Sequence, residues 1–366
     1  MDAYEEEDKL FVKEAYVQAL SMIDCSEYLP QLEVRLQELV AYDAPEEEKK
    51  HVQAEIRALQ ELLLQKKGVK KHTFNGWNRS SEVLLLTIPA FRDALAEEVT
   101  GKKKVLKSGV RTIVPDFETV MKIRTIQELL FVIHTQTEGN VLSADPETLA
   151  AQLAESDLMQ ILAETHKGDV PFCFRIGVSG AMSLEERSIF SKRVATAIEG
   201  AFERNLINST SHYEVELRLL QHREGGFVPL LKLYTLPDHR FDYRRYYVAA
   251  SMKPMMAAGL MALAKPYLKE YAQILDPFCG VGTLLMERRF AVPARNAYGI
   301  DTFGEAIEKA RVNSKIAGMQ TNYINRDYFD FVHDYKFDEI VTDLPAGNLS
   351  KPELDDLYRR FFEKIR

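Results

Sequence analysis

Three segments in the last third of the chain share one pattern, in which an apolar run ends in Asp and a turn follows. They are Ile274–Thr283, Tyr298–Asp301 and Asp338–Gly347. The first carries two glycines, which let a backbone pass close to a ligand, and the second ends in a carboxylate that can accept hydrogen bonds. The third places Asp343 before a Leu-Pro-Ala turn. Together the segments predict a ligand site that has a reactive carboxylate beside it.

The segment Asp276-Pro-Phe-Cys-Gly-Val-Gly-Thr283 lies between a predicted strand at 272–276 and a predicted helix at 282–290. Free N–H groups at the start of that helix favour a polar ligand. Asp301 ends the next predicted strand, 19 residues after Gly282, where an acid accepts hydrogen bonds from ribose hydroxyls. The pattern predicts these cofactor-binding residues: Asp276, Phe278, Gly280, Gly282, Thr283 and Asp301.

A dinucleotide site would satisfy the same spacing. The Asp-Pro-Phe-Cys prefix separates the two interpretations, because NAD sites usually begin directly with Gly-x-Gly. Asp327 is a further predicted cofactor ligand, since it follows a predicted strand near 321–325, where an adenine amino group would be met. A helix cap or a solvated acid is the alternative for this residue.

Asp343, Leu344 and Pro345 follow the fourth predicted strand and form the predicted catalytic motif. An exocyclic amine of a base is a poor nucleophile, because its lone pair is delocalised into the ring. A carboxylate and a backbone carbonyl that accept its two N–H bonds turn the lone pair toward a methyl group. The motif resembles the Asp/Asn-Pro-Pro-aromatic motif of methyltransferases that act on such amines. Leu344 departs from its second position, and Ala346 lacks the aromatic ring that stacks on a flipped-out base.

From residue 255 onward, helices and strands alternate, which predicts an α/β fold with a parallel, doubly wound, Rossmann-like sheet. The predicted helices are 255–270, 282–290, 304–317 and 351–366, and the predicted strands are 272–276, 297–301, 321–325 and 337–342. A full class I methyltransferase sheet has seven strands. The sheet is therefore expected to be incomplete at the C-terminus, and a fragment, completion by a partner and a degenerate protein all stay open.

The sequence before this sheet divides into three further parts and a predicted linker at 69–79, which carries turn formers and bases. The first part is a helical segment, and Gly68 suits the end of its last helix. Strands and helices interleave in the next two parts, as in small α+β domains. The four predicted domains are 1–68, 80–140, 141–236 and 237–366.

The net charge of -8 is unevenly distributed. Residues 1–66 hold 16 Asp or Glu and 7 Lys or Arg, while the rest of the chain holds 39 and 40. The overall acidity therefore says little about binding of nucleic acid beyond the N-terminal segment. No apolar run approaches the roughly 20 residues of a membrane span, and the first residues are too acidic for a secretory signal. Three scattered cysteines form no zinc spacing and no disulfide framework, so we expect no metal, no membrane association and a cytoplasmic location.

These motifs resemble those of the THUMP-domain RNA methyltransferases of the N2-methylguanosine type. Residues 81–134 are similar to the ferredoxin-like N-terminal part of that family, 145–235 to its THUMP domain, and 240–254 to the connector before its catalytic domain. The resemblance implies S-adenosyl-L-methionine as the cofactor and tRNA or rRNA as the substrate.

RNA binding has support in two clusters of side chains, because basic residues hold phosphates and aromatic rings stack on bases. One cluster is a basic run made of Lys102, Lys103, Lys104, Lys107 and Arg111. The other interleaves Arg240, Arg244 and Arg245 with Phe241, Tyr243, Tyr246 and Tyr247. A solvated loop is the alternative for the first cluster, and internal packing is the alternative for the second.

Three functions remain in competition. The leading hypothesis is an RNA N2-guanine methyltransferase. The second is a non-catalytic RNA-binding protein that retains the THUMP and cofactor-binding folds, which Ala346 and the short sheet favour. The third is a dinucleotide-dependent oxidoreductase, for which no candidate for hydride chemistry stands out. The sequence leaves the RNA, the modified nucleotide and the oligomeric state open.

Overall fold

The computed structural model describes residues 1–67, 72–77, 80–346 and 349–365. Several predicted features lie outside these described residues. They are Gly68, residues 69–71 and 78–79 of the predicted linker, and Gly347 of the third motif. The chain forms two compact units, and each is built from two separate stretches of sequence. One unit comprises 1–76 and 133–236, and the other comprises 77–132 and 237–366.

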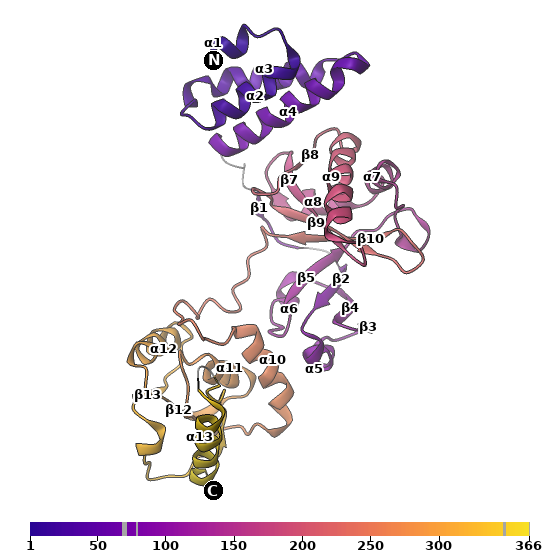
Figure 1. The fold of residues 1–366 in the computed structure, drawn as a ribbon. Helices are drawn as coiled ribbons and strands as arrows, with labels where there is room; N and C mark the ends of the chain where they lie inside the picture. Colours follow the sequence, from indigo (N-terminus) through magenta and orange to yellow (C-terminus); the bar gives the residue numbers. More distant parts are fainter. Residues whose placement is uncertain (68–71, 78–79, 347–348, 366) are drawn as a thin grey trace. The chain divides into compact units, whose positions relative to one another are not determined.

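The first unit begins with a helical bundle, as predicted (Figure 1). Leu32 and Leu59 are completely buried between its helices, and the buried Glu55 accepts a hydrogen bond from the Tyr4 hydroxyl at 2.6 Å and pairs with Arg35 at 3.1 Å. An ion in such an interior must be paired, so this network fixes how the helices meet. The elements are α1 (Asp2–Glu5), α2 (Leu10–Ser21), η1 (Ser26–Tyr28), α3 (Leu29–Ala41) and α4 (Glu46–Lys67).

The rest of the first unit mixes helices and strands. Four of its strands lie in the order β10-β9-β7-β8, with β10 antiparallel to β9 and both β9 and β8 parallel to β7. The long helix α9, which starts with a capping box at Ser183, makes the crossover from β7 to β8. The elements are η3 (Glu138–Asn140), α7 (Pro146–Ala154), α8 (Leu158–Thr165), β6 (His166–Lys167), β7 (Phe172–Ser179), α9 (Leu184–Ala201), β8 (Leu206–Asn208), β9 (Val215–Gln221) and β10 (Phe227–Leu233).

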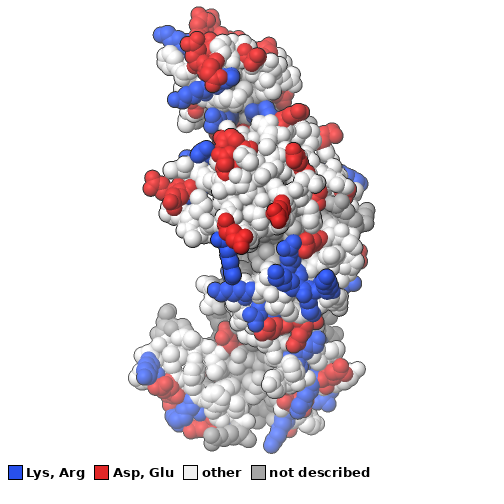
Figure 2. Space-filling model, turned by 90° about the vertical axis from the view of Figure 1, so that its right-hand side faces the viewer, with Lys and Arg blue, Asp and Glu red and all other residues white. Residues whose placement is uncertain are grey.

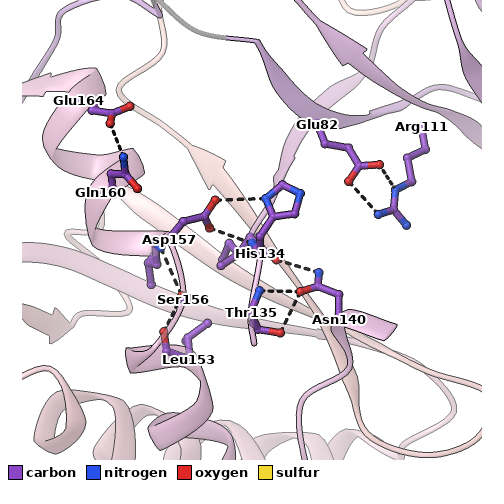
Figure 3. A network of polar contacts seen from close by, with 12 residues as sticks. Glu82, Arg111, His134, Thr135, Asn140, Leu153, Ser156, Asp157, Gln160 and Glu164 are labelled. Carbon is purple, nitrogen blue, oxygen red and sulfur yellow. Dashed lines mark hydrogen bonds and ion pairs between the residues drawn. The ribbon is translucent and has the colours of Figure 1, made fainter. Parts of the chain in front are cut away.

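A polar network ties the start of this domain to the start of α8 (Figure 3). The Asp157 carboxylate accepts the backbone N–H of His134 at 2.8 Å and contacts the His134 ring Nδ1 at 3.1 Å. The Asn140 side chain accepts the backbone N–H of Thr135 and donates to the Ile133 carbonyl, both at 2.8 Å. These bonds satisfy backbone groups where no strand partner is available.

The predicted linker is wrong for residues 72–77, which are folded. Strand β1 (Thr73–Phe74) pairs antiparallel with β6. The buried His72 donates its backbone N–H to the Glu214 carboxylate at 2.7 Å, and its ring Nδ1 lies 2.9 Å from the same carboxylate. Trp77 stacks on Phe131 in the second unit, with ring centroids 4.1 Å apart. The turn-forming residues predicted a loop here. A strand of only two residues is too short to show the alternation of apolar and polar side chains that predicts a strand.

The second unit contains four antiparallel strands in the order β3-β4-β2-β5. The Arg111 guanidinium of β4 makes a two-bonded ion pair with Glu82 of β2, at 2.7 and 2.9 Å (Figure 3). The predicted basic run is the β3–β4 hairpin and not an irregular loop. The elements are β2 (Ser81–Leu86), η2 (Pro89–Phe91), α5 (Arg92–Glu98), β3 (Lys103–Leu106), β4 (Gly109–Val114), α6 (Phe117–Val120) and β5 (Glu128–Val132).

The same unit holds the predicted Rossmann-like sheet, in the order β13-β12-β11-β14 with all neighbours parallel. Every residue of β11 is buried, as expected for a central strand covered by helices on its faces. Helix α10 is shorter than predicted, because Pro266 stops it and a 3-10 turn follows. The elements are α10 (Pro254–Ala264), η4 (Lys265–Tyr267), β11 (Ala272–Asp276), α11 (Thr283–Ala291), β12 (Ala294–Asp301), α12 (Gly304–Ile316), β13 (Asn322–Asn325), η5 (Tyr328–Asp330), β14 (Glu339–Ile340) and α13 (Lys351–Lys364).

Strand β14 is short, and a buried ion pair holds it in place. The Arg288 guanidinium of α11 is completely buried and contacts both carboxylate oxygens of Glu339 at 2.7 and 3.0 Å. Its remaining N–H groups donate to the carbonyls of Val292 and Lys269 at 2.6 and 2.8 Å. The pair therefore fixes the strand that leads into Asp343. None of the described helices is long and apolar enough to cross a membrane.

We predict that Arg288→Met lowers the free energy of unfolding by about 3–5 kcal/mol, because it leaves a buried carboxylate without a cation. Thermal unfolding measures the effect, with Arg295→Met as the control, since Arg295 is exposed and its loss should cost less than about 0.5 kcal/mol. Adding Glu339→Gln to Arg288→Met should recover part of the loss. Equal unfolding midpoints for the two single Arg variants would contradict this role.

Candidate active site

Four acidic residues stand at the carboxyl ends of the four parallel strands. Asp276 and Asp301 are the last residues of β11 and β12, while Asp327 and Asp343 lie two and three positions beyond the ends of β13 and β14. Neighbouring parallel strands end at one edge of the sheet, where open α/β folds bind their ligands. All four acids line one cleft of about 710 Å³. The predicted site residues Phe278, Gly280, Thr283, Leu344 and Pro345 line the same cleft.

The turn after β11 is fastened to Asp301. One carboxylate oxygen of Asp301 accepts the Gly280 N–H at 2.8 Å, and the other accepts the Phe303 N–H at 2.8 Å. Gly280 has a φ of +51°, and a Cβ there would meet no atom within 4 Å. The Thr283 hydroxyl, at the start of α11, is buried and has no hydrogen-bond partner among the described residues. An orphaned buried hydroxyl beside open space fits a polar ligand that is bound in this turn.

Gly282 has a different structural reason to be glycine. Its φ is +77°, and a Cβ would lie 2.2 Å from the Tyr323 hydroxyl. Tyr323 is itself buried and hydrogen-bonds to Ser314 at 2.7 Å. Gly282 is absent from the described residues that line the cleft. Close packing against β13 therefore accounts for this glycine, and its predicted contact with a cofactor stays a prediction.

Asp276 is buried, with 1% of its surface exposed. One of its oxygens accepts the Thr342 hydroxyl at 2.6 Å and the Phe278 N–H at 3.1 Å. Burial raises the pKa of this carboxyl to about 7, with smaller upward contributions from the charges of Asp301 and Asp343, while the two hydrogen bonds lower it. Burial prevails, so the pKa of Asp276 lies well above the ordinary value of a carboxyl.

The predicted catalytic motif has both an exposed and an anchored part. Asp343 is exposed and makes no hydrogen bond to any residue that the structure describes. Leu344 packs against the aromatic cluster of the sheet, and the Pro345 carbonyl accepts the Tyr358 hydroxyl of α13 at 3.3 Å. The carboxylate is therefore available to a ligand, while the backbone after Leu344 is held at the Pro345 carbonyl. Ala346 is exposed and offers no ring.

Two further predicted ligands have structural roles. Asp327 accepts the Phe329 N–H at 2.8 Å and thereby caps η5, as the alternative for this residue had it. It also lines the cleft. Phe278 belongs to an aromatic group with Tyr328 and Phe361, at ring-centroid distances of 5.9 and 6.1 Å.

Sequence reasoning missed several contributors to the cleft. The hydroxyl of Thr342 positions Asp276, and Leu357 and Arg360 of α13 form part of the cleft wall. A stretch of the connector, 248–252, forms another part. The three-residue spacing of Leu357 and Arg360 places them on one helical face, and that was the available signal. Among the described residues, no group of three or more His, Cys, Asp or Glu side chains is arranged to hold a metal ion.

The Arg/Tyr cluster is partly internal. The Arg240 guanidinium donates to the carbonyls of Ile123 and Ile126 at 2.7 and 3.1 Å. The buried Tyr243 hydroxyl donates to the Glu287 carboxylate at 2.6 Å. The packing alternative therefore holds for these two residues. Three members of the cluster stay exposed, namely Arg245, Tyr246 and Tyr247.

The basic hairpin is partly free. Lys103 donates to the last carbonyls of α5, Ala96 and Val99, and Arg111 is paired with Glu82. Lys103 is exposed as well, and the exposed Lys102, Lys104 and Lys107 make no ammonium hydrogen bond or ion pair with the residues that the structure describes. Figure 2 shows Lys and Arg side chains gathered on this side of the second unit, around the level of the β3–β4 hairpin.

Comparison with known proteins identifies the part of the chain that carries the cleft. Residues 242–366 match the family described as the RMKL-like methyltransferase domain. The matched residues include all four strands of the parallel sheet and the acids at their ends. A tRNA (guanine(10)-N2)-dimethyltransferase of Methanothermobacter thermautotrophicus is 32% identical over 146 residues, which is 37% of this chain and 42% of that protein. The chain thus spans less than half the length of this curated relative.

Two solved structures share the fold of the chain more widely. TrmN from Thermus thermophilus has a TM-score of 0.60 at 20% identity and aligns with 78% of this chain and 84% of its own. SMU.472, a putative methyltransferase complexed with SAH, has a TM-score of 0.59 at 16% identity, with 78% and 86% covered. The aligned share exceeds the methyltransferase domain, so the fold likeness extends into the residues before it. The predicted α/β, Rossmann-like methyltransferase fold is confirmed.

We predict that Asp276 makes stability depend on pH. Its folded pKa lies above the ordinary value, so the folded state keeps a proton that the unfolded chain loses as pH rises from about 4 to 7. The folded state is therefore progressively destabilised over this range, and the loss levels off above about pH 7. Asp276→Asn retains the acceptor oxygen and removes the titration. The unfolding midpoint of the variant, relative to that of the wild type, should rise from pH 5 to 7. Parallel pH profiles of the two proteins would contradict a raised pKa of Asp276.

Proposed function

We propose that the protein is an S-adenosyl-L-methionine-dependent RNA methyltransferase that modifies the exocyclic N2 of guanosine in tRNA or rRNA. The observation that carries the proposal is the cleft itself. It joins a glycine turn with an orphaned hydroxyl to an exposed carboxylate, Asp343, on the end of the neighbouring strand. The methyltransferase domain and the activity named for the archaeal relative support the same reaction.

The residues present fit the cofactor. Gly280 and Thr283 offer open space and an unpartnered hydroxyl, and Asp301 has lone pairs left for ribose hydroxyls after its two backbone bonds. A related structure was solved with SAH, the demethylated form of this cofactor. When bound, S-adenosyl-L-methionine supplies an electrophilic methyl group on a sulfonium.

Asp343 and the Leu344 carbonyl then act on the base. They accept the two N–H bonds of the exocyclic amine, which turns its lone pair out of the ring and toward the methyl group. Asp343 also stands ready to take the proton that the amine loses. The contact between α13 and the Pro345 carbonyl keeps the acceptor backbone in place, so positioning is the main contribution.

In this proposal, parts of the chain outside the cleft bind the RNA. The exposed lysines of the β3–β4 hairpin hold phosphates, and residues 145–235 serve as the THUMP-like RNA-binding domain. Three buried, free cysteines are consistent with the reducing cytoplasm as the place of action. A non-catalytic RNA-binding protein is the alternative, and the missing ring at Ala346 is the observation that favours it.

We predict that Asp301→Ala weakens binding of S-adenosylhomocysteine roughly 10- to 150-fold, because it removes a charged acceptor and releases the Gly280 and Phe303 N–H groups. Isothermal titration measures the change. Asp355→Ala is the matched control, since Asp355 is exposed and does not line the cleft. An affinity equal to that of the control would remove Asp301 from the cofactor site.

We predict that Asp343→Ala lowers methyl transfer at least 100-fold and leaves binding of S-adenosylhomocysteine and of RNA nearly unchanged, because its contacts form mainly in the transition state. Transfer of labelled methyl to unfractionated unmodified tRNA and to rRNA, followed by nucleoside analysis for N2-methylguanosine, gives the measurement. If the wild-type chain binds these RNAs and transfers no methyl group, the non-catalytic alternative replaces the enzyme.

A further inference from the structure

The motif at 343–346 has no ring on which a target base can stack, so the source of that platform is an open structural question. Two guanidinium side chains, Arg326 and Arg360, line the cleft among the described residues, and Arg360 lies on an aromatic ring. The Arg360 guanidinium lies over the Phe329 ring, with its carbon 3.9 Å from the ring centroid, and both residues line the cleft together with Asp343 and Ala346. Guanidinium planes and aromatic rings are the two side-chain surfaces on which proteins stack RNA bases.

The helix that carries Arg360 is fastened at both sides of the cleft. Tyr358 donates to the Pro345 carbonyl of the motif at 3.3 Å. Lys364 donates to the carbonyls of Tyr328, Phe329 and Phe331 at 2.9, 2.7 and 2.8 Å. Phe361 is buried in the aromatic cluster that Leu344 and Phe329 also join. Arg360 therefore stands between the catalytic motif and η5 on a helix that cannot shift freely.

Arg360 makes only a long ion pair within the described part of the protein. Its nearest acid is Asp356, at 4.0 Å, and its side chain remains 47% exposed. The neighbouring Arg359 behaves differently, because it pairs with both Asp356 and Glu363 and does not line the cleft. One face of the Arg360 guanidinium is covered by Phe329, which leaves the other face to a planar ligand.

We infer that the stacked pair of Phe329 and Arg360 is the platform for the target base, in place of the ring that the motif lacks at 346. This inference rests on the proposed function, and it assigns the pair a positioning role while Asp343 acts on the amine. The guanidinium, which is planar by itself, holds a purine by stacking and by its charge, and Phe329 supports its other face.

Arg360→Lys tests the pair, because it retains the charge and removes the plane, and Arg359→Lys is the matched control on the same helix. The probe is a single-stranded RNA hexanucleotide with one central 2-aminopurine, whose emission falls when the base stacks. We expect Arg360→Lys to weaken binding and quenching of this probe by about 5- to 150-fold and to lower kcat/KM for tRNA by a similar factor. Phe329→Leu should act in the same direction, and Arg359→Lys should match the wild type.

Binding of S-adenosylhomocysteine separates the possible occupants of the platform. It should change less than twofold in Arg360→Lys. A loss of affinity for S-adenosylhomocysteine as large as the loss for the probe would assign the stack to the adenine of the cofactor and overturn the inference. Probe binding in Arg360→Lys equal to that in Arg359→Lys would overturn it as well, even with an active enzyme. A wild-type chain that quenches the probe and transfers no methyl would instead refute the proposed function and leave the platform supported.

Discussion

The Asp343 carboxylate depends on a strand that pairs with its neighbour over only two residues, and a buried ion pair compensates for that short pairing. Arg288 joins α11 to Glu339 of β14, and Asp338 reinforces the same register, since its N–H donates to the Gln273 carbonyl and its carboxylate accepts the Gln273 N–H. A guanidinium without exposure requires all of its partners, because unpaired charge in the interior costs several kcal/mol. The ion pair thus fixes the position of the motif after β14, because the strand itself has few backbone hydrogen bonds to its neighbour.

Helix α13 connects the motif after β14 to the loop on the other side of the cleft. It contacts the motif through Tyr358 and the η5 loop through Lys364, so the loops after β13 and β14 are not independent of each other. The Lys364 ammonium also lies near the C-terminal end of its own helix, where a cation is favourable. A single helix therefore contacts the loop that carries Asp327 and the motif that carries Asp343, and its Arg360 side chain lines the cleft with both.

The parts of the fold with strong periodicity could be predicted from the sequence. The apolar run of β11 and the acids that end β11 and β12 carry their own signal, because a buried strand needs apolar residues and a turn must follow it. Strand β3 lacked that signal, since two of its four residues are exposed lysines. Arg240 and Gly282 show a second limit. The Arg240 guanidinium donates to the carbonyls of Ile123 and Ile126, and Gly282 packs closely on Tyr323, while its predicted cofactor contact stays a prediction. These structural partners lie far away in sequence, so residue type alone could not predict them.

The charges of the cleft bear on how RNA can enter it. Four acids line the cleft, and the cations that line it are Arg326 and Arg360. Even with a proton on Asp276, the described lining keeps an excess of negative charge at neutral pH, and phosphates are disfavoured there by Coulomb repulsion. A neutral base carries no such penalty, whereas a cationic cofactor is attracted. Under the proposed function, the backbone of the RNA must therefore stay outside with the lysines of the β3–β4 hairpin, and the target base must leave its stack to reach Asp343. A planar cation at the rim, such as Arg360, would then be the first surface that receives the base.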